Sequence, residues 1–259
     1  MAAVEPPVLV HRQGPVVEVV LNRPARRNAI GGGMGEALDA LIAELREDRE
    51  ARVVVLRGAG GHFCAGLDLA EVASSPDEQG ARTRAVGARF VAISELPQVV
   101  IAAVEGAAHA GGLGFLCSAD IAFGAADARL AAPEVRRGLV PAQILPWLVR
   151  RMGRANAARM VLEGAALDAA TACRMGLLDE VAADRAGLDA LVARSVANIV
   201  QGGPLALAET KGLLGALAAL APAGYAEAGA AAFGRTAAGS EAAEGIAAFR
   251  EKRSAAWVV

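Results

Sequence analysis

The stretch from Val99 to Asp120 reads VVIAAVEGAAHAGGLGFLCSAD. Its first part, Val99–Val104, is apolar and β-branched, which is typical of an interior strand. Gly111, Gly112 and Gly114 follow, and glycines let backbone amides come close to whatever lies above a turn. Free amides at the start of a helix attract negative charge. The stretch therefore predicts a buried strand, a glycine turn and a helix. The glycines serve either an anionic ligand group or tight packing of strand against helix.

A second stretch has the same order of features, Val53–Leu69, VVVLRGAGGHFCAGLDL. Its apolar strand leads into a turn with three glycines, after which Ala65–Asp68 is expected to open a helix. Two such turns can bring amides from different segments to one oxygen, which makes an oxyanion hole for an enolate or a tetrahedral intermediate. A phosphate loop is the weaker alternative, because no Lys-Ser/Thr pair follows the glycines and no G-x-G-x-x-G follows either strand.

Alternation of strands and helices elsewhere predicts an α/β core. In the first part of the chain, the expected elements are a strand over Val16–Leu21, a helix from Met34, a polar loop over Ser74–Arg84, a helix ending at Pro97, a strand over Asp120–Phe123 and a helix over Pro141–Arg151. After Pro204 we expect Ala- and Leu-rich helices with breaks near Gly224 and Gly239, and Ser240 as the cap of the last helix.

The overall composition narrows the function classes. Hydrophobic residues make up 54% of 259 residues, which is ample for a core, and the formal net charge of -2 argues against a general nucleic-acid or membrane-surface binder. Apolar runs stop short of membrane-spanning length, and no targeting segment is evident, so a cytoplasmic protein is expected. Cys64, Cys117 and Cys173 are widely spaced in apolar surroundings, so they predict buried thiols and imply no metal cofactor.

Several motifs in order resemble the enoyl-CoA hydratase/isomerase, or crotonase, superfamily. They are the two glycine turns, LNRPARRNAI (21–30), APEVRRGLVP (132–141) and FREKR (249–253), and together they cover nearly the whole chain. The resemblance implies a spiral of ββα repeats as the catalytic core over residues 1–203. It also implies a C-terminal helical region over residues 204–259 that packs between the subunits of a homotrimer or hexamer.

The resemblance also assigns roles to residues. The oxyanion amides belong to Leu67 and Gly111, and the acid/base residue is Glu134. Residues that would bind the coenzyme A part of the substrate are Arg26, Arg27, Ala29, Ala65, Asp68, Leu69, Phe249 and Lys252. For these, ordinary structural roles remain open: solvated turn arginines, a helix cap at Asp68, and a plain helix face at the C-terminus. No separate cofactor is implied, because coenzyme A is part of the substrate.

The position of Gly114 bears most directly on the reaction. Hydratases of this superfamily usually carry two glutamates, and Gly114 occupies the place of the first, so that Glu134 alone remains. One carboxyl in an apolar pocket should have a raised pKa and can move one proton, which suffices to shift a double bond. Hydration is also open if another group orients water. His109 is a candidate for that role, unless it is simply a hydrogen-bonded interior histidine.

The sequence thus predicts an acyl-CoA enzyme, with reversible hydration of a 2-enoyl-CoA as the first hypothesis and double-bond isomerisation as the alternative. A minor alternative is a non-catalytic CoA-binding or RNA-binding assembly protein, which the missing glutamate motivates and the lack of a basic stripe disfavours. Residues 138–144 resemble, locally, the branch that hydrates branched glutaconyl-CoA esters such as isohexenylglutaconyl-CoA and methylglutaconyl-CoA. This leaves the acyl group open.

Overall fold

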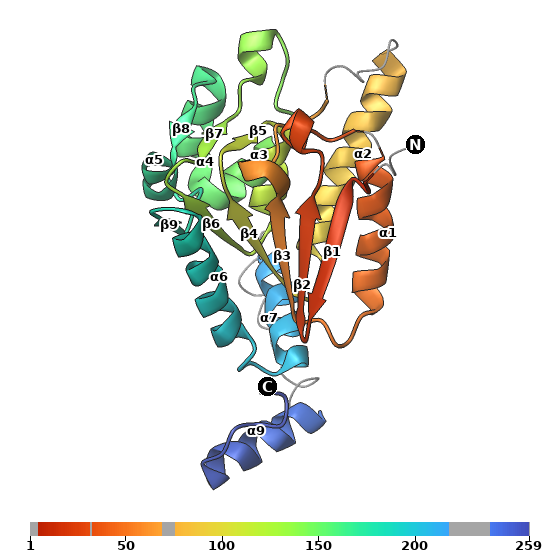
Figure 1. The fold of residues 1–259 in the computed structure, drawn as a ribbon, viewed down its shortest axis with the longest axis vertical. Coiled ribbons are helices and arrows are strands. Elements are labelled where there is room, and N and C mark those ends of the chain that lie inside the picture. Colours follow the sequence, from red (N-terminus) through yellow and green to blue (C-terminus); the bar gives the residue numbers. More distant parts are fainter. Residues whose placement is uncertain (1–4, 32, 69–75, 218–238, 259) are drawn as a thin grey trace.

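A twisted, mostly parallel sheet forms the centre of the protein (Figure 1). The computed structural model describes residues 5–31, 33–68, 76–217 and 239–258. The main sheet has the order β1-β2-β3-β4-β6-β9, and β1 alone is antiparallel to its neighbour. A smaller sheet has the order β5-β7-β8. The strands are β1 (Val8–Gln13), β2 (Val16–Leu21), β3 (Val53–Gly58), β4 (Val99–Val104), β5 (Ala107–His109), β6 (Ile121–Ala125), β7 (Arg129–Ala131), β8 (Leu167–Asp168) and β9 (Glu180–Ala182).

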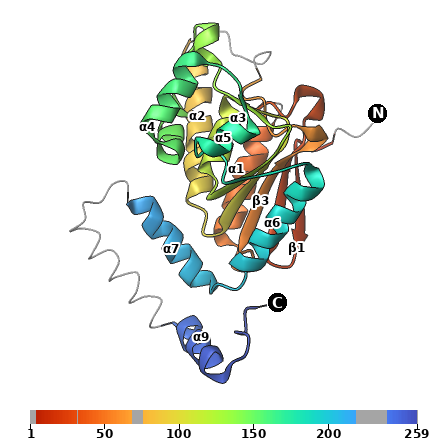
Figure 2. The same ribbon diagram turned by 90° about the vertical axis from the view of Figure 1, so that its left-hand side faces the viewer.

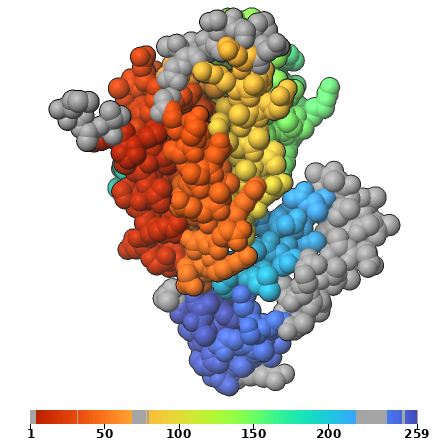
Figure 3. All heavy atoms as spheres, turned by 90° about the vertical axis from the view of Figure 1, so that its right-hand side faces the viewer, coloured from red at the N-terminus to blue at the C-terminus, as the bar shows by residue number. Residues whose placement is uncertain are grey.

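Helices cover both faces of the main sheet because its central strands are apolar on both sides. Along β3, Val54 and Leu56 join the larger core, whereas Val53 and Val55 face a second core on the other side. The larger core lies under α1 (Met34–Glu47), α2 (Pro76–Ser94), α3 (Gly111–Ser118), α4 (Leu145–Glu163) and α5 (Ala169–Arg174), and the second core under α6 (Arg185–Ile199). Figure 3 shows α1 and α2 side by side over one face of the molecule.

The C-terminal helices extend away from the sheet (Figure 2). Lys211 of α7 (Pro204–Ala216) ties that helix to the sheet, since its Nζ lies 2.7 Å from the Gln98 carbonyl and 2.7 Å from Asp120 Oδ2. Burial lowers the pKa of Lys211, and the neighbouring Asp120 carboxylate opposes that shift. Asp120 also accepts the amide of Val100, so it is a structural residue at the start of the strands.

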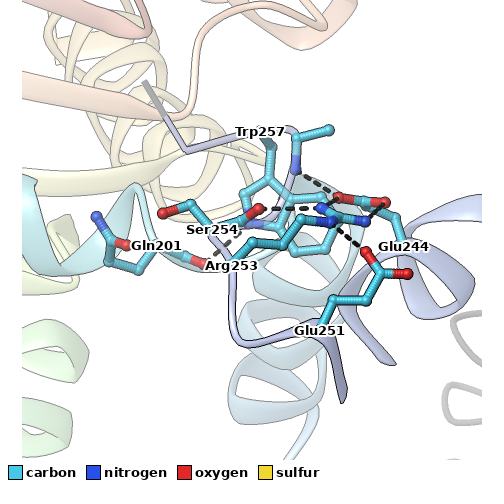
Figure 4. Close-up of polar contacts among 7 residues, drawn as sticks. Gln201, Glu244, Glu251, Arg253, Ser254 and Trp257 are labelled. Atoms are coloured by element: carbon cyan, nitrogen blue, oxygen red, sulfur yellow. Dashed lines mark hydrogen bonds and ion pairs between the residues drawn. The ribbon is translucent and has the colours of Figure 1, made fainter. Parts of the chain in front are cut away.

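Polar contacts hold α9 (Ser240–Glu251) to the junction between α6 and α7 (Figure 4). Arg253 pairs with Glu244 and Glu251, each at 2.6 Å, and so folds the end of the chain back on α9. Trp257 Nε1 donates to the Gln201 carbonyl at 2.9 Å. Glu241 in the first turn of α9 also accepts the Leu205 amide of α7 at 2.9 Å, so the last helix is attached through its own first turn and through the chain ending that follows it.

Most of the expected elements are present, and a few differ. The strands at Val16, Val53 and Val99, the helix from Met34 and the helix from Pro204 are confirmed. The expected strand over Asp120–Phe123 is shifted to Ile121–Ala125, and the helix expected from Pro141 begins at Leu145 and passes a non-helical Gly153. Ser240 is the first residue of α9 and not its cap, and the break expected near Gly224 lies outside the described residues.

Two sequence predictions near the site need correction. Ala65–Asp68 is itself not helical, because Leu67 pairs with Ile30 in an isolated parallel bridge, and residues 69–75 that follow lie outside the described part of the chain. The polar segment expected to be a loop up to Arg84 is helical from Pro76 onward, as part of α2. Among the described helices, none is both long enough and apolar enough to cross a membrane.

Candidate active site

The glycine turn that carries Leu67 is fixed by backbone hydrogen bonds on both of its sides. Ile30 donates to the Gly66 carbonyl at 2.7 Å and accepts the Asp68 amide at 3.1 Å. These two bonds flank Leu67, so its own N–H points to the opposite side. On that side, the segment pairs with β5 three residues before Leu67, where the Cys64 N–H donates to the Ala107 carbonyl at 2.9 Å. The Leu67 amide is thus presented by backbone pairing that involves no flexible side chain.

The second amide belongs to the first residue of α3. Ala110, the residue before it, has φ 50 and ψ -119, a region that non-glycine residues rarely adopt and that is typical of functional sites. Ala110 is fixed there because its N–H donates to the Ala131 carbonyl of β7 at 2.9 Å. The backbone then enters the helix with the N–H of Gly111 at the helix start, where intrahelical acceptors are missing.

The two turns meet at a pair of glycines. A Cβ on Gly66, which has φ +89, would come within 3.1 Å of Gly111 N and 2.9 Å of the His109 carbonyl. A Cβ on Gly111 would lie 3.8 Å from Leu67 N. Only glycine fits this close approach. The two turns therefore place Leu67 and Gly111 close to one another.

A cavity of about 350 Å³ opens beside these amides. Its wall includes Leu67, Gly111 and Glu134, together with apolar side chains from α2 and from the segment after Glu134, such as Phe90 and Leu139. An apolar cavity with few convergent polar groups is the usual form of a small-molecule site.

Glu134 is one of two carboxyl groups that line the same cavity as Leu67 and Gly111, and Asp68 is the other. Glu134 begins a short 3-10 helix, Glu134–Arg137, that ends at Gly138 with φ 70. The side chain is half-buried, and Oε2 has no hydrogen-bond partner in the described part of the chain. Burial raises the pKa of Glu134, while its own backbone amide and the Arg137 charge oppose that shift. A carboxyl group whose pKa is raised in this way can both take and return a proton.

The space beside Gly114, where the resemblance led us to expect a glutamate in two-glutamate hydratases, is filled by an aromatic ring. A Cβ on Gly114 would lie 2.1 Å from Phe90 Cζ and 2.7 Å from Phe90 Cε1. Phe90 is fully buried, and its ring meets Phe115 edge to face at 5.2 Å. A side chain at position 114 would therefore need the space that Phe90 occupies. The sequence revealed the glycine but not the ring that faces it.

His109 lies beside the site and is not among the residues that line the cavity. Its ring is half-buried, and Nε2 has no hydrogen-bond partner among the described residues. Burial lowers the pKa of His109, and the positive charges of Arg137 and Arg27 add to that effect, so the ring is neutral near pH 7. Its place outside the cavity lining gives no support to water activation by His109.

We expect His109→Leu to retain most of the turnover. A positioned acid/base residue contributes about 10² to 10⁴-fold, and the loss here should stay below that range. The loss of stability should be modest, about 0.5–1.5 kcal/mol, because the leucine removes an unpartnered buried nitrogen but also the hydrogen bond between the ring and the Arg129 backbone. Steady-state rates and urea midpoints would check both points. A hundredfold loss of turnover with an unchanged midpoint would instead give His109 a role in the reaction.

Only some of the residues expected to bind coenzyme A line the cavity. Arg26 and Arg27 are exposed, Ala29 is buried, and Ala65 lines the cavity. Asp68 also lines it. Leu69 and the side chain of Phe249 lie outside the described residues.

Arg23, which the sequence analysis did not single out, fixes Asp68 in the wall of the cavity. Its Nη2 lies 3.0 Å from Asp68 Oδ2, and Nη1 donates to the Ala29 carbonyl at 2.8 Å. Asp68 is therefore fixed as the partner of a guanidinium. Lys252 is exposed and directly follows α9, which lies at the far end of the molecule from α3, the helix that begins at Gly111 (Figure 1). Within one chain it does not reach the site.

Comparison with known proteins gives the family. The family model for enoyl-CoA hydratase/isomerase matches residues 11–258. The chain is 35% identical over 214 residues to enoyl-CoA hydratase EchA19 of Mycobacterium tuberculosis, covering 80% of each protein. It is 36% identical to the mitochondrial enoyl-CoA hydratase domain-containing protein 2 of Bos taurus over 174 residues, which are 65% of this chain and 58% of that protein.

Solved structures agree with this result. An enoyl-CoA hydratase/isomerase from Marinobacter aquaeolei superposes with a TM-score of 0.92 at 35% identity, covering 98% of this chain and 99% of that one. AtuE of Pseudomonas aeruginosa superposes with a TM-score of 0.95 at 36% identity, covering 98% and 100%. The chain belongs to the enoyl-CoA hydratase/isomerase family, and its α/β fold is the crotonase fold.

Proposed function

We propose that the protein binds an acyl-CoA thioester, holds its carbonyl oxygen with the Leu67 and Gly111 amides, and moves a proton with Glu134. The leading reaction is reversible hydration of a 2-enoyl-CoA. One observation carries the proposal: the unpartnered carboxyl oxygen of Glu134 belongs to a residue that lines the same cavity as Leu67 and Gly111, which lie close to one another. Hydrogen bonds from the amides strengthen as the thioester becomes an enolate, which lowers the barrier.

The proton balance needs only one carboxyl group. In hydration, Glu134 takes a proton from water as the hydroxyl oxygen adds to C3, and the electron pair of the double bond moves onto the thioester as an enolate. Glu134 then returns the proton to C2. In isomerisation, Glu134 removes a proton from C2 or C4 and returns it to the other carbon.

Isomerisation is the second candidate, and the ring of Phe90 favours it. Because Phe90 fills the space beside Gly114, no carboxylate at that position can hold the attacking water. Incubation with a 2-enoyl-CoA and with a 3-enoyl-CoA separates the reactions, since hydration adds the mass of one water and isomerisation leaves the mass unchanged. We expect product from the 2-enoyl-CoA with the added mass. If both thioesters bind but neither reacts, the proposal is wrong, and hydrolase, decarboxylase or dehalogenase-like chemistry would have to be tested.

We also propose that residues 1–203 form the catalytic core and that residues 204–259 hold subunits together in a trimer or hexamer. The C-terminal helices expose apolar side chains in the single chain, with Leu214 60%, Leu217 48% and Ile246 53% exposed. Figure 2 supports this view, because α9 lies apart from the core of its own chain. Phe249 and Lys252 would then contact coenzyme A bound to a neighbouring subunit.

Truncation after Gly203 should abolish the native oligomer. It removes the exposed apolar helices and also the Lys211 contact with Asp120, so the shortened chain should become a monomer or aggregate. Leu214→Lys is the milder variant, because a side chain that is 60% exposed can change without disturbing the single chain. Light scattering measures the mass. Unchanged mass in both variants would contradict the interface assignment.

A further inference from the structure

An attacking water is fixed in one orientation when both of its O–H groups donate to acceptors. In the proposed hydration, one O–H points to Glu134, which takes that proton. The other O–H needs an oxygen that holds the water while its lone pair attacks C3. Gly114 has no side chain to supply that oxygen, and the ring of Phe90 fills the space beside it. The second acceptor therefore has to come from another part of the cavity wall.

Most of the other polar side chains of the cavity wall are unsuitable as this acceptor. Asp68 is held in an ion pair at 3.0 Å, and Arg82 and Thr83 have interaction partners of their own. Arg82 and Arg137 also carry guanidinium groups, which donate hydrogen bonds and accept none. Gln143 is half-buried, and its amide forms no hydrogen bond with any described residue. Its uncharged carbonyl oxygen is therefore an available acceptor.

The amide of Gln143 lies on α2, one helical turn from Phe90. A Cβ on Gly87 would lie 2.9 Å from Gln143 Cδ and closer still to Oε1, so the amide rests on the bare backbone of α2 at this glycine. Gly87 and Phe90 are three positions apart and share one face of the helix, about 4.5 Å apart along its axis. Val86 of α2 lines the cavity as well. The amide therefore lies close to the space beside Gly114 that the Phe90 ring fills.

The backbone holds Gln143 at this place. Gln143 belongs to the turn that leads into α4, where the Leu145 N–H donates to the Pro141 carbonyl at 3.1 Å. Ile144, the next residue, is buried in the larger core. A group that orients a water has to be held in position itself, and this turn meets that requirement.

We propose that Gln143 binds the attacking water through Oε1 and orients it toward C3 of the 2-enoyl-CoA. The water gives one proton to Glu134, as its oxygen forms the bond to C3. The hydrogen that it donates to Gln143 stays on the oxygen and becomes the hydroxyl hydrogen of the product, so Gln143 exchanges no proton. The inference rests on the proposed function, because it takes hydration as the reaction.

Gln143→Leu separates the addition of water from proton transfer, because it removes the acceptor and leaves Glu134 in place. Hydration is followed with but-2-enoyl-CoA or hex-2-enoyl-CoA, whichever the wild type hydrates faster, and should fall about 10²-fold. Exchange of the C2 hydrogens of saturated butanoyl-CoA in heavy water, followed by mass, should stay close to the wild-type rate, because it needs Glu134 and no attacking water. Gln143→Glu keeps an acceptor oxygen and should hydrate faster than Gln143→Leu.

Gly87→Ala displaces the same amide without changing Gln143 itself. Because the amide ends a flexible side chain, the new Cβ should push it off α2 with little loss of stability. Hydration should then fall while the exchange at C2 persists. Gly80→Ala makes the same change in α2 where nothing lies within 4 Å, and this control should keep the wild-type rates of both reactions.

Three results would overturn the role of Gln143 alone. The first is hydration by Gln143→Leu at the wild-type rate. The second is an equal loss of hydration and exchange, which would mean a structural role. The third is an unchanged rate at saturating substrate with weaker binding of butanoyl-CoA, which would place Gln143 against the acyl chain. A wild type that hydrates neither 2-enoyl-CoA would instead overturn the proposed hydration, and this inference with it.

Discussion

Glu134→Gln is expected to lower turnover about 10² to 10⁴-fold, whichever of the two reactions the protein catalyses. Glutamine keeps the size and most hydrogen bonds of the side chain, but it cannot take and return a proton. The binding of a saturated acyl-CoA should change little, because the Leu67 and Gly111 amides belong to the backbone. Steady-state rates and calorimetry on the same preparations measure the two effects separately.

Asp68→Asn is the matched comparison, because Asp68 is another carboxylate that lines the cavity. Its pairing with Arg23 makes it a part of the wall, so this variant should lose stability more than chemistry. Nearly full activity in Glu134→Gln together with a large loss in Asp68→Asn would move the proton-transfer role to Asp68.

The wild-type rate should also fall at acidic pH through a pKa above the ordinary 4.5 of glutamate, because burial favours the protonated form of Glu134 and proton removal needs the ionised form.

The sequence predicts the strands of the site and the residues that meet there better than it predicts the shape of the backbone between them. Val53–Gly58 and Val99–Val104 are strands because apolar runs of this length fit a sheet covered on both faces. Leu67 was expected in a helix and is extended, because its neighbours pair with Ile30, which lies far away in the sequence. A local sequence pattern does not show with which distant residue a segment pairs.

Phe90 and Arg137 were missed for related reasons. Periodicity places Phe90 in a helix core, but nothing in the sequence states that its ring faces Gly114 from another helix. In Arg136-Arg137 the two side chains look equivalent, but in the structure only Arg137 lines the cavity, whereas Arg136 Nε donates to the Glu163 carbonyl. A basic residue three positions after a suspected catalytic glutamate is the signal that could have pointed to Arg137, provided that the turn type were known.

Gly114→Ala is expected to destabilise the protein, which is the opposite of the usual effect in a helix. Replacing glycine by alanine inside a helix normally stabilises by about 1 kcal/mol. Here the new Cβ would lie 2.1 Å from Phe90 Cζ, and the fully buried ring has little room to move against Phe115. Overpacking of this kind costs about 1–3 kcal/mol. Gly80→Ala in α2, where nothing lies within 4 Å, is the control and should be stabilising.

Phe90→Leu supplies the second half of a double-mutant cycle, because leucine lacks the outer ring atoms that approach Gly114. In that background Gly114→Ala should become neutral or stabilising, with a coupling free energy of about 0.5–3 kcal/mol from urea unfolding. The same background lets Gly114→Glu add a second carboxyl group to the site, and the ratio of hydration to isomerisation should then rise. If Gly114→Ala stabilises the wild type, the ring yields easily. Phe90 would then not be the group that keeps a side chain out of this position, and proton transfer by Glu134 alone would need another explanation.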